Sequence, residues 1–417
     1  MSIGYACLAL GVPGSGMKGC IMKNADDDLL LSLIGSNLDA LGRLVSYNAK
    51  NGIRMFRISS DVIPFGSSLA EKLPWQERYS EKLGSIGAEV RRTGMRVSMH
   101  PGQYTVLNST DENIADRAAK DLEYHAKVLD GLELGPEHKM ILHLGGVYGD
   151  KKRAKERFVS RYKRLDPAVK RRLVLENDDK LFDIRDVIET ASEAGMPAVY
   201  DNLHNAVNPA DASRRDVEWI EECKKTWTEE DGPQKVHYSQ QNLGKRPGAH
   251  SESIRIDEFL DYYGEASRTG TDIMLEVKDK NLSALKCINC VSDRGMKALE
   301  AEWARYKYSV MERAPDRYHA IRELLKDKTS YPALEMYRSI EKSLVTPIGT
   351  NNAVDAAQHV WGYVKDKATE PEKKRFRDTL NAFMSGNAEL RSVKNTLHTL
   401  AQKYGEDYLL NAYYFYI

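Results

Sequence analysis

The chain has 417 residues, 41% of them hydrophobic, which is ample for a packed core and favours two or more domains. Its 61 basic residues equal its 61 acidic ones, so a nucleic-acid partner would have to meet a local positive patch rather than a polycation. The five cysteines are few for this length and argue against a disulfide scaffold. No apolar run approaches the roughly 20 residues that span a bilayer, which argues against a membrane protein. Because Met1 begins no secretory pattern, we expect a cytoplasmic chain.

From the N-terminus, the first three quarters of the chain alternate short β-rich runs with longer amphipathic runs. The predicted strands are 3–9, 55–58, 97–100, 140–144, 173–176, 198–201, 236–239 and 273–277. The predicted helices between them include 29–51, 75–93, 115–129, 184–194 and 214–226, several of them followed by a glycine. A repeated β-then-α order implies parallel strands with crossover helices, and eight such units favour a closed (β/α)₈ TIM barrel of the α/β class.

Beyond the last predicted strand the alternation stops and helical periodicity dominates. The predicted helices are 301–311, 318–325, 331–344, 352–367, 371–385 and 393–404. Pro371 lies at the start of one of them, where proline is favoured. We therefore predict a barrel domain over residues 1–297 and an all-α domain over residues 298–417.

Imidazole and carboxylate side chains gather at the ends of the predicted strands. His100 ends the third, His143 lies near the end of the fourth, Glu176 ends the fifth, Asp201 and His204 follow the sixth, Lys235 and His237 lie on the seventh with His250 in its loop, and Glu276 ends the eighth. In a barrel the strand ends converge on one face, where catalytic residues collect. A single histidine is usually structural, but six consecutive strand ends favour a shared site.

These residue types indicate divalent metal ions. The set holds five histidines and three carboxylates and no cysteine, so a thiolate zinc site is not indicated. Eight ligands suffice for two or three ions, and paired ions about 4 Å apart hydrolyse phosphodiesters because they activate water and neutralise the anionic phosphate. We expect Mn²⁺, with Zn²⁺ or Mg²⁺ as the alternatives.

Several segments, in order, resemble the UV damage endonuclease family. They are RISS (57–60), HPGQY (100–104), HLGGVYGDK (143–151), LENDDK (175–180), DNLH (201–204), KVHYS (235–239), AH (249–250) and LEVK (275–278). The resemblance covers about residues 1–290. The glycine-rich block after His143 and the LENDDK block are more specific than any single metal-ligand spacing.

The resemblance implies a metal-dependent endodeoxyribonuclease of DNA repair. Such an enzyme nicks DNA immediately 5′ of UV photoproducts, both cyclobutane pyrimidine dimers and 6-4 photoproducts, and also acts on abasic sites. The implied metal ligands are His100, His143, Glu176, Asp201, His204, His237, His250 and Glu276. Glu176, Glu276 and Lys235 would form the catalytic centre, with Lys235 matching a lysine that can be carboxylated.

The resemblance also implies a way of meeting DNA. Gln103 and Tyr104 match a pair that wedges into the duplex at the lesion, where a crosslinked dimer costs less to flip than normal bases. Tyr5 matches a residue of the lesion pocket. The expected partner is damaged double-stranded DNA, bound by a monomer.

Two positions depart from the family pattern. Ser68 stands where the family usually has a histidine ligand, which bears on a third metal ion. Ala9 lies where the first loop often carries an asparagine, which bears on the lesion pocket.

Two further segments have open interpretations. The basic stretch 151–172 either contacts phosphates or forms a solvated helix face, with Lys151 favoured as a DNA contact because it directly follows the His143 loop. The last hundred residues resemble a helical domain of unknown role.

Two other functions fit parts of the pattern. A sugar isomerase or epimerase on a related barrel uses the same ligand types, and a non-catalytic damage-binding module would tolerate Ser68. The basic stretch and the Gln103–Tyr104 pair favour the DNA enzyme.

Overall fold

The computed structural model describes all 417 residues, which divide into two compact units. Unit 1 comprises Met1–Ala9 and Gly14–Leu285, and unit 2 comprises Leu10–Pro13 and Lys286–Ile417. The break lies upstream of residue 297, within helix α11 (Asn281–Val291). The second half of α11 belongs to unit 2 because it bonds to helix α14 (Ala333–Leu344). Lys286 Nζ lies 2.6 Å from Glu341 Oε1, and Asn289 donates to the Tyr337 hydroxyl.

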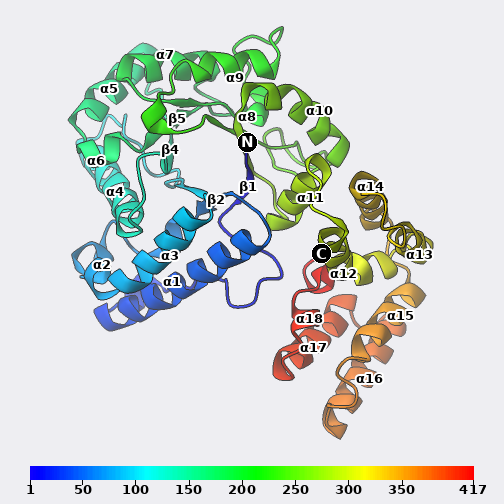
Figure 1. The fold of residues 1–417 in the computed structure, drawn as a ribbon. Helices are drawn as coiled ribbons and strands as arrows, with labels where there is room; N and C mark the ends of the chain where they lie inside the picture. Colours follow the sequence, from blue (N-terminus) through cyan, green and yellow to red (C-terminus); the bar gives the residue numbers. More distant parts are fainter. The chain divides into compact units, whose positions relative to one another are not determined.

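Unit 1 is the predicted (β/α)₈ barrel (Figure 1). Its strands are β1 (Ile3–Ala6), β2 (Met55–Ile58), β3 (Arg96–Met99), β4 (Lys139–His143), β5 (Leu173–Glu176), β6 (Ala198–Val199), β7 (Lys235–Tyr238) and β8 (Asp272–Leu275). All are parallel, in the order β6-β5-β4-β3-β2-β1-β8-β7. A single bridge between Asp201 and His237, with the His237 amide donating to the Tyr200 carbonyl, joins β6 to β7.

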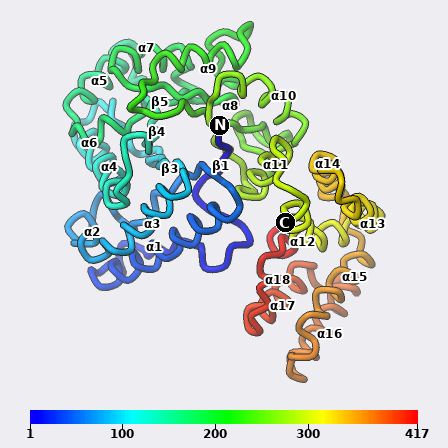
Figure 2. Tube along the Cα trace, viewed as in Figure 1, coloured from blue at the N-terminus to red at the C-terminus, as the bar shows by residue number.

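Helices surround these strands, as the chain trace shows (Figure 2). They are α1 (Asp27–Lys50), α2 (Trp75–Arg78), α3 (Ser80–Arg92), α4 (Glu112–Gly131), α5 (Lys151–Arg164), α6 (Pro167–Lys170), α7 (Ile184–Ala194), α8 (Asn202–Val207), α9 (Asp216–Lys224), α10 (Ile256–Ala266) and α11 (Asn281–Val291). Because both faces of the strands are covered, they are buried throughout and mostly apolar, and the few charged residues on them stand out.

Helix α1 is the one segment long and apolar enough to cross a membrane by composition. Its apolar side, which includes Leu30, Ile34, Leu38 and Leu41, is fully buried. A stripe of this kind is typical of an outer helix of a barrel.

Unit 2 is all helical, as predicted. Its helices are α12 (Met296–Met311), α13 (Pro315–Leu324), α14 (Ala333–Leu344), α15 (Thr350–Trp361), α16 (Glu370–Met384), α17 (Leu390–Lys403) and α18 (Asp407–Leu410). One apolar core joins residues of α12, α15, α16 and α17 with the C-terminal Tyr414.

Candidate metal centre

Glu176 lies at the middle of the predicted ligand set. It ends β5, is 1% exposed, and belongs to each of the three groups whose ligand atoms lie within 4.8 Å of one another. The groups are His100–His143–Glu176, Glu176–Asp201–His204 and Glu176–His237–Glu276. The structure thus brings together seven of the eight predicted ligands, from β4, β5 and β7 and from the segments that follow β3, β6 and β8.

Distances around Glu176 show how tightly the set is packed. Its Oε2 lies 3.1 Å from His100 Nε2 and 3.6 Å from His143 Nε2, and its Oε1 lies 2.6 Å from His237 Nδ1. Burial opposes ionisation of this carboxyl, but His237 and His143 outweigh that effect and hold its pKa well below the usual range. Glu176 is therefore an anion at neutral pH, as a metal ligand has to be.

Arg57, on β2, supplies a buried positive charge at the opposite side of the cluster. Its guanidinium bonds to Glu276 Oε1, and its Nη2 lies 3.0 Å from His237 Nε2. Burial would raise the pKa of Glu276, but Arg57 and His237 lower it far below its usual range. Arg57 lies within the RISS motif but was not among the predicted site residues, although it is the one charged residue in the otherwise apolar strand MFRI.

His237 is the ring that connects the two carboxylates. It is fully buried, with Nδ1 2.6 Å from Glu176 and 3.2 Å from Glu276. Burial lowers its pKa to about 4, so the imidazole is neutral at physiological pH. Its Nδ1 faces the two carboxylates, and its Nε2 lies 3.0 Å from Arg57 Nη2.

Asp201 and His204 form the third part of the centre. Asp201 caps α8 by accepting from the His204 amide, and its Oδ1 lies 3.8 Å from His204 Nδ1. Burial raises the pKa of Asp201 to about 7, and the neighbouring carboxylates outweigh burial to raise the pKa of His204 to about 9. The second oxygen of Asp201 is buried without a hydrogen-bond partner, which costs free energy unless a cation meets it.

Lys235 lies at the start of β7 and is 1% exposed. Its ammonium nitrogen has no hydrogen-bond partner. Burial, followed by repulsion from Arg96 and Arg57, lowers its pKa well below that of an ordinary lysine. Burial at this position therefore favours the uncharged amine over the ammonium ion.

The centre opens into a cavity of 360 Å³ at the mouth of the barrel. His250 lines it, with Nδ1 3.9 Å from Glu276 Oε2, so the eighth predicted ligand lies beside the seven others. Gln103 and the basic residues Lys180 and Arg246 also line it. The cavity therefore combines an anionic floor with cations at its rim.

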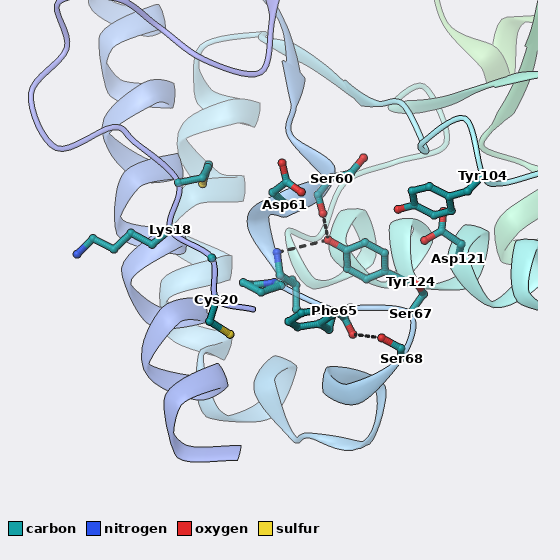
Figure 3. Close-up of a pocket in the computed structure, with 15 residues that line it drawn as sticks. Lys18, Cys20, Ser60, Asp61, Phe65, Ser67, Ser68, Tyr104, Asp121 and Tyr124 are labelled. Atoms are coloured by element: carbon teal, nitrogen blue, oxygen red, sulfur yellow. Dashed lines mark hydrogen bonds between the residues drawn. The ribbon is translucent and has the colours of Figure 1, made fainter. Parts of the chain in front are cut away.

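The residues predicted to meet DNA lie in different places. Tyr104 is 70% exposed and stands beside a second cavity of 540 Å³ lined by Ser68 (Figure 3). Lys151, at the start of α5, pairs with Asp186 of α7. Tyr5 is fully buried and its hydroxyl donates to Asn48 of α1, so its ring offers no surface to DNA here.

The departure at Ser68 has a structural counterpart. The Ser68 hydroxyl donates to the Phe65 carbonyl at 3.3 Å, and the residue belongs to none of the three ligand groups. The β2 loop therefore brings no ligand to the centre.

Comparison with known proteins decides the family. A family described as "UV-endonuclease UvdE" matches residues 15–303, and a UV DNA damage endonuclease of Clostridium perfringens is 39% identical over 389 residues, 91% of this chain and 92% of the relative. The chain belongs to the UvdE family. The predicted resemblance is thus confirmed.

Other relatives match a smaller share of this chain. A UV DNA damage endonuclease of Bacillus cereus is 30% identical over 284 residues, 67% of this chain and 89% of the relative. The crystal structure of SacUVDE is 32% identical with a TM-score of 0.66, and the match covers 70% of this chain and 98% of that one. Residues 307–417 match a family described as "Protein of unknown function (DUF1722)".

Proposed function

We propose that this UvdE chain is a metal-dependent endodeoxyribonuclease that nicks damaged duplex DNA immediately 5′ of UV photoproducts, and also at abasic sites. The observation that carries the proposal is the sharing of the buried Glu176 by three ligand groups at the barrel mouth. The relatives named as UV DNA damage endonucleases support the substrate class.

The donor set fits divalent ions. Imidazole nitrogens and carboxylate oxygens without a thiolate suit Mn²⁺, Zn²⁺ or Mg²⁺, and the unpartnered second oxygen of Asp201 is a free ligand atom. His100, His143, Glu176, Asp201, His204, His237, His250 and Glu276 would hold two or three ions. Such ions activate water and stabilise the charge that develops on the phosphate.

The remaining side chains act on DNA and on the ligands. Lys180 and Arg246, at the rim of the cavity, meet backbone phosphates, and Gln103 and Tyr104 enter the duplex beside the lesion. Arg57 keeps Glu276 ionised and packs beside His237, with Nη2 3.0 Å from His237 Nε2. We propose a monomeric enzyme of the cytoplasm, with Lys235 carboxylated.

The proposal is tested with a labelled duplex that carries one cyclobutane pyrimidine dimer. We expect a Mn²⁺-dependent cut directly 5′ of the dimer, no cut in the undamaged duplex, and no cut with EDTA. The Glu276→Gln variant should lose at least about 100-fold in kcat, because it removes an anionic ligand from a preorganised centre.

An exposed position provides the matched control. Glu252→Gln, in the loop that follows β7, should cut like the wild-type chain. Full nicking by Glu276→Gln, or nicking by the wild-type chain that persists in EDTA, would contradict the proposed chemistry.

A further inference from the structure

Three buried polar residues share one face of α4 and form hydrogen bonds with residues outside the helix. Asp121, Tyr124 and His125 are 3%, 4% and 0% exposed, and their spacing of three and four places them side by side. A buried polar side chain costs free energy unless it is hydrogen-bonded. Their partners outside α4 lie in the loops after β2 and β3, at the barrel mouth.

The first set of bonds fixes the end of β3 at His100. The Ser60 hydroxyl donates to the His100 carbonyl at 2.9 Å, and His125 Nε2 lies 2.9 Å from the same hydroxyl oxygen. The Tyr124 hydroxyl donates to the Ser60 carbonyl at 2.6 Å, as the dashed line in Figure 3 marks. Helix α4 thus holds the β2 loop, and the β2 loop holds His100.

A second bond fixes the chain five residues later. The Thr105 hydroxyl donates to Asp121 Oδ2 at 2.6 Å, and both residues are buried. The Thr105 amide also donates to the Gly102 carbonyl at 2.9 Å, which closes a tight turn. The segment 100–105 is therefore tied at both ends to one helix.

Of the four residues between these anchors, Gln103 and Tyr104 face different cavities. Gln103 lines the cavity of the metal centre, and Tyr104 lines the 540 Å³ cavity that lies over α4 and the β2 loop (Figure 3). A small rotation of the segment would move both side chains together.

We propose that the Thr105–Asp121 pair is a positioning pair, which holds Gln103 and Tyr104 in the orientation that opens the duplex at a lesion. The inference rests on the proposed function. Neither residue of the pair belongs to a ligand group of the centre. Holding the segment before DNA binds reduces the conformational entropy lost on binding.

The test uses Thr105→Val, which replaces the buried hydroxyl with a methyl group of similar size. We expect kcat/KM on the dimer duplex to fall by about 100-fold, since a misplacement of about 1 Å has that effect. The fluorescence rise of a 2-aminopurine placed beside the dimer, which reports base opening, should be lost with it. Bound Mn²⁺ and hydrolysis of bis(p-nitrophenyl) phosphate, which needs no base opening, should stay within about twofold of the wild-type values.

Two conservative variants separate positioning from general damage to the fold. Thr105→Ser keeps a hydroxyl and Asp121→Asn keeps an acceptor oxygen, so both variants should retain the cutting and the fluorescence rise that Thr105→Val loses. The inference is overturned if Thr105→Val cuts like the wild type, if it loses both substrates equally, or if Thr105→Ser fails to restore cutting. A wild-type chain that leaves the dimer duplex intact overturns the proposed function itself, which distinguishes the two failures.

Discussion

Lys235 carries an amine in a place where an ammonium ion is strongly disfavoured. It is buried without a partner, and Arg57 and Arg96 both repel a positive charge there. An unprotonated lysine amine is a nucleophile. Attack on CO₂ forms an N–C bond and releases a proton, leaving a carbamate anion that both arginines would attract.

We predict that Lys235 takes up CO₂. After incubation with ¹³C-bicarbonate, the wild-type chain should show one carbamate carbon signal by NMR, and Lys235→Met should lack it. Lys245→Met, at an exposed lysine, is the control and should keep the signal. An identical spectrum from Lys235→Met would show that Lys235 is not the modified residue.

The clustering of the candidate ligands could be predicted from the sequence because the ends of parallel barrel strands all lie at one face. His100, His143, Glu176 and Glu276 needed only a correct strand assignment to be placed together. A strand assignment alone does not show to which face of β1 the Tyr5 side chain points. Successive side chains of a strand point to opposite faces, and four residues of β1 do not reveal which set faces inward.

Helices α3 and α4 approach so closely that one position tolerates only glycine. A Cβ added at Gly87 would lie 1.8 Å from the Leu132 carbonyl oxygen, whereas one at Gly84, on the same helix, would meet only the end of the Glu133 side chain at 3.7 Å. The close approach depends on the absence of a side chain at Gly87.

We predict opposite effects of alanine at these two glycines. Gly87→Ala should lower the free energy of unfolding by about 1–3 kcal/mol, because the helices have to separate. Gly84→Ala should raise it by up to about 1 kcal/mol, because alanine favours a helix. Urea denaturation of both variants measures the difference, and equal stabilities would mean that α3 and α4 are not packed this closely.

Glu372 connects α16 to α17 in the helical unit. Its carboxylate accepts from Lys403 Nζ and from the Tyr404 hydroxyl, each at 2.6 Å. The bonds from Lys403 and Tyr404 lower the pKa of Glu372 to about 2. A carboxyl with a lowered pKa stabilises the fold above its unfolded value and loses that contribution as pH falls toward the folded value.

We therefore predict that unit 2 loses stability between about pH 4.5 and pH 2, and that Glu372→Gln flattens this part of the profile. Chemical denaturation at each pH, followed by a signal from unit 2, measures it. The control is Glu335→Gln, at an exposed glutamate of α14, whose profile should follow the wild type. A Glu372→Gln profile as steep as the wild type would rule out this carboxyl as the source.

The sequence predicted where helices form better than it predicted which residues of other elements those helices contact. Residues 75–93 were expected as one helix, but the chain breaks at Tyr79, whose hydroxyl donates to the Leu31 carbonyl of α1. The basic stretch that begins α5 was left between two interpretations, and its Lys155 pairs with Asp186 and Glu189 of α7. Such tertiary partners lie far away in the chain and leave no local pattern.

Tyr414, near the C-terminus, belongs to the core of unit 2. Tyr414 is fully buried among α12, α15 and α17, and its hydroxyl has no hydrogen-bond partner. We predict that Tyr414→Ala lowers the stability of unit 2 by about 3–5 kcal/mol, as other buried aromatic truncations do. Tyr414→Phe removes only the unpartnered hydroxyl and should cost less than about 1 kcal/mol or be neutral.

Thermal denaturation of the full chain compares these two variants. Equal losses for Tyr414→Phe and Tyr414→Ala would mean that the hydroxyl, rather than the ring, carries the stabilisation. The Clostridium perfringens relative matches 91% of this chain, so the match extends into the helical unit as well as the barrel.

The wall of the barrel is thinnest between β6 and β7, where β6 has two residues and one bridge joins Asp201 to His237. Those two residues are also candidate metal ligands, one on each side of this junction between β6 and β7. They belong to two ligand groups that share Glu176, so ions held by both groups would bind the closed wall more tightly than a parted one, and ion binding and closure would be linked equilibria. Catalytic competence and the integrity of the barrel would then respond together to the supply of metal in the cell.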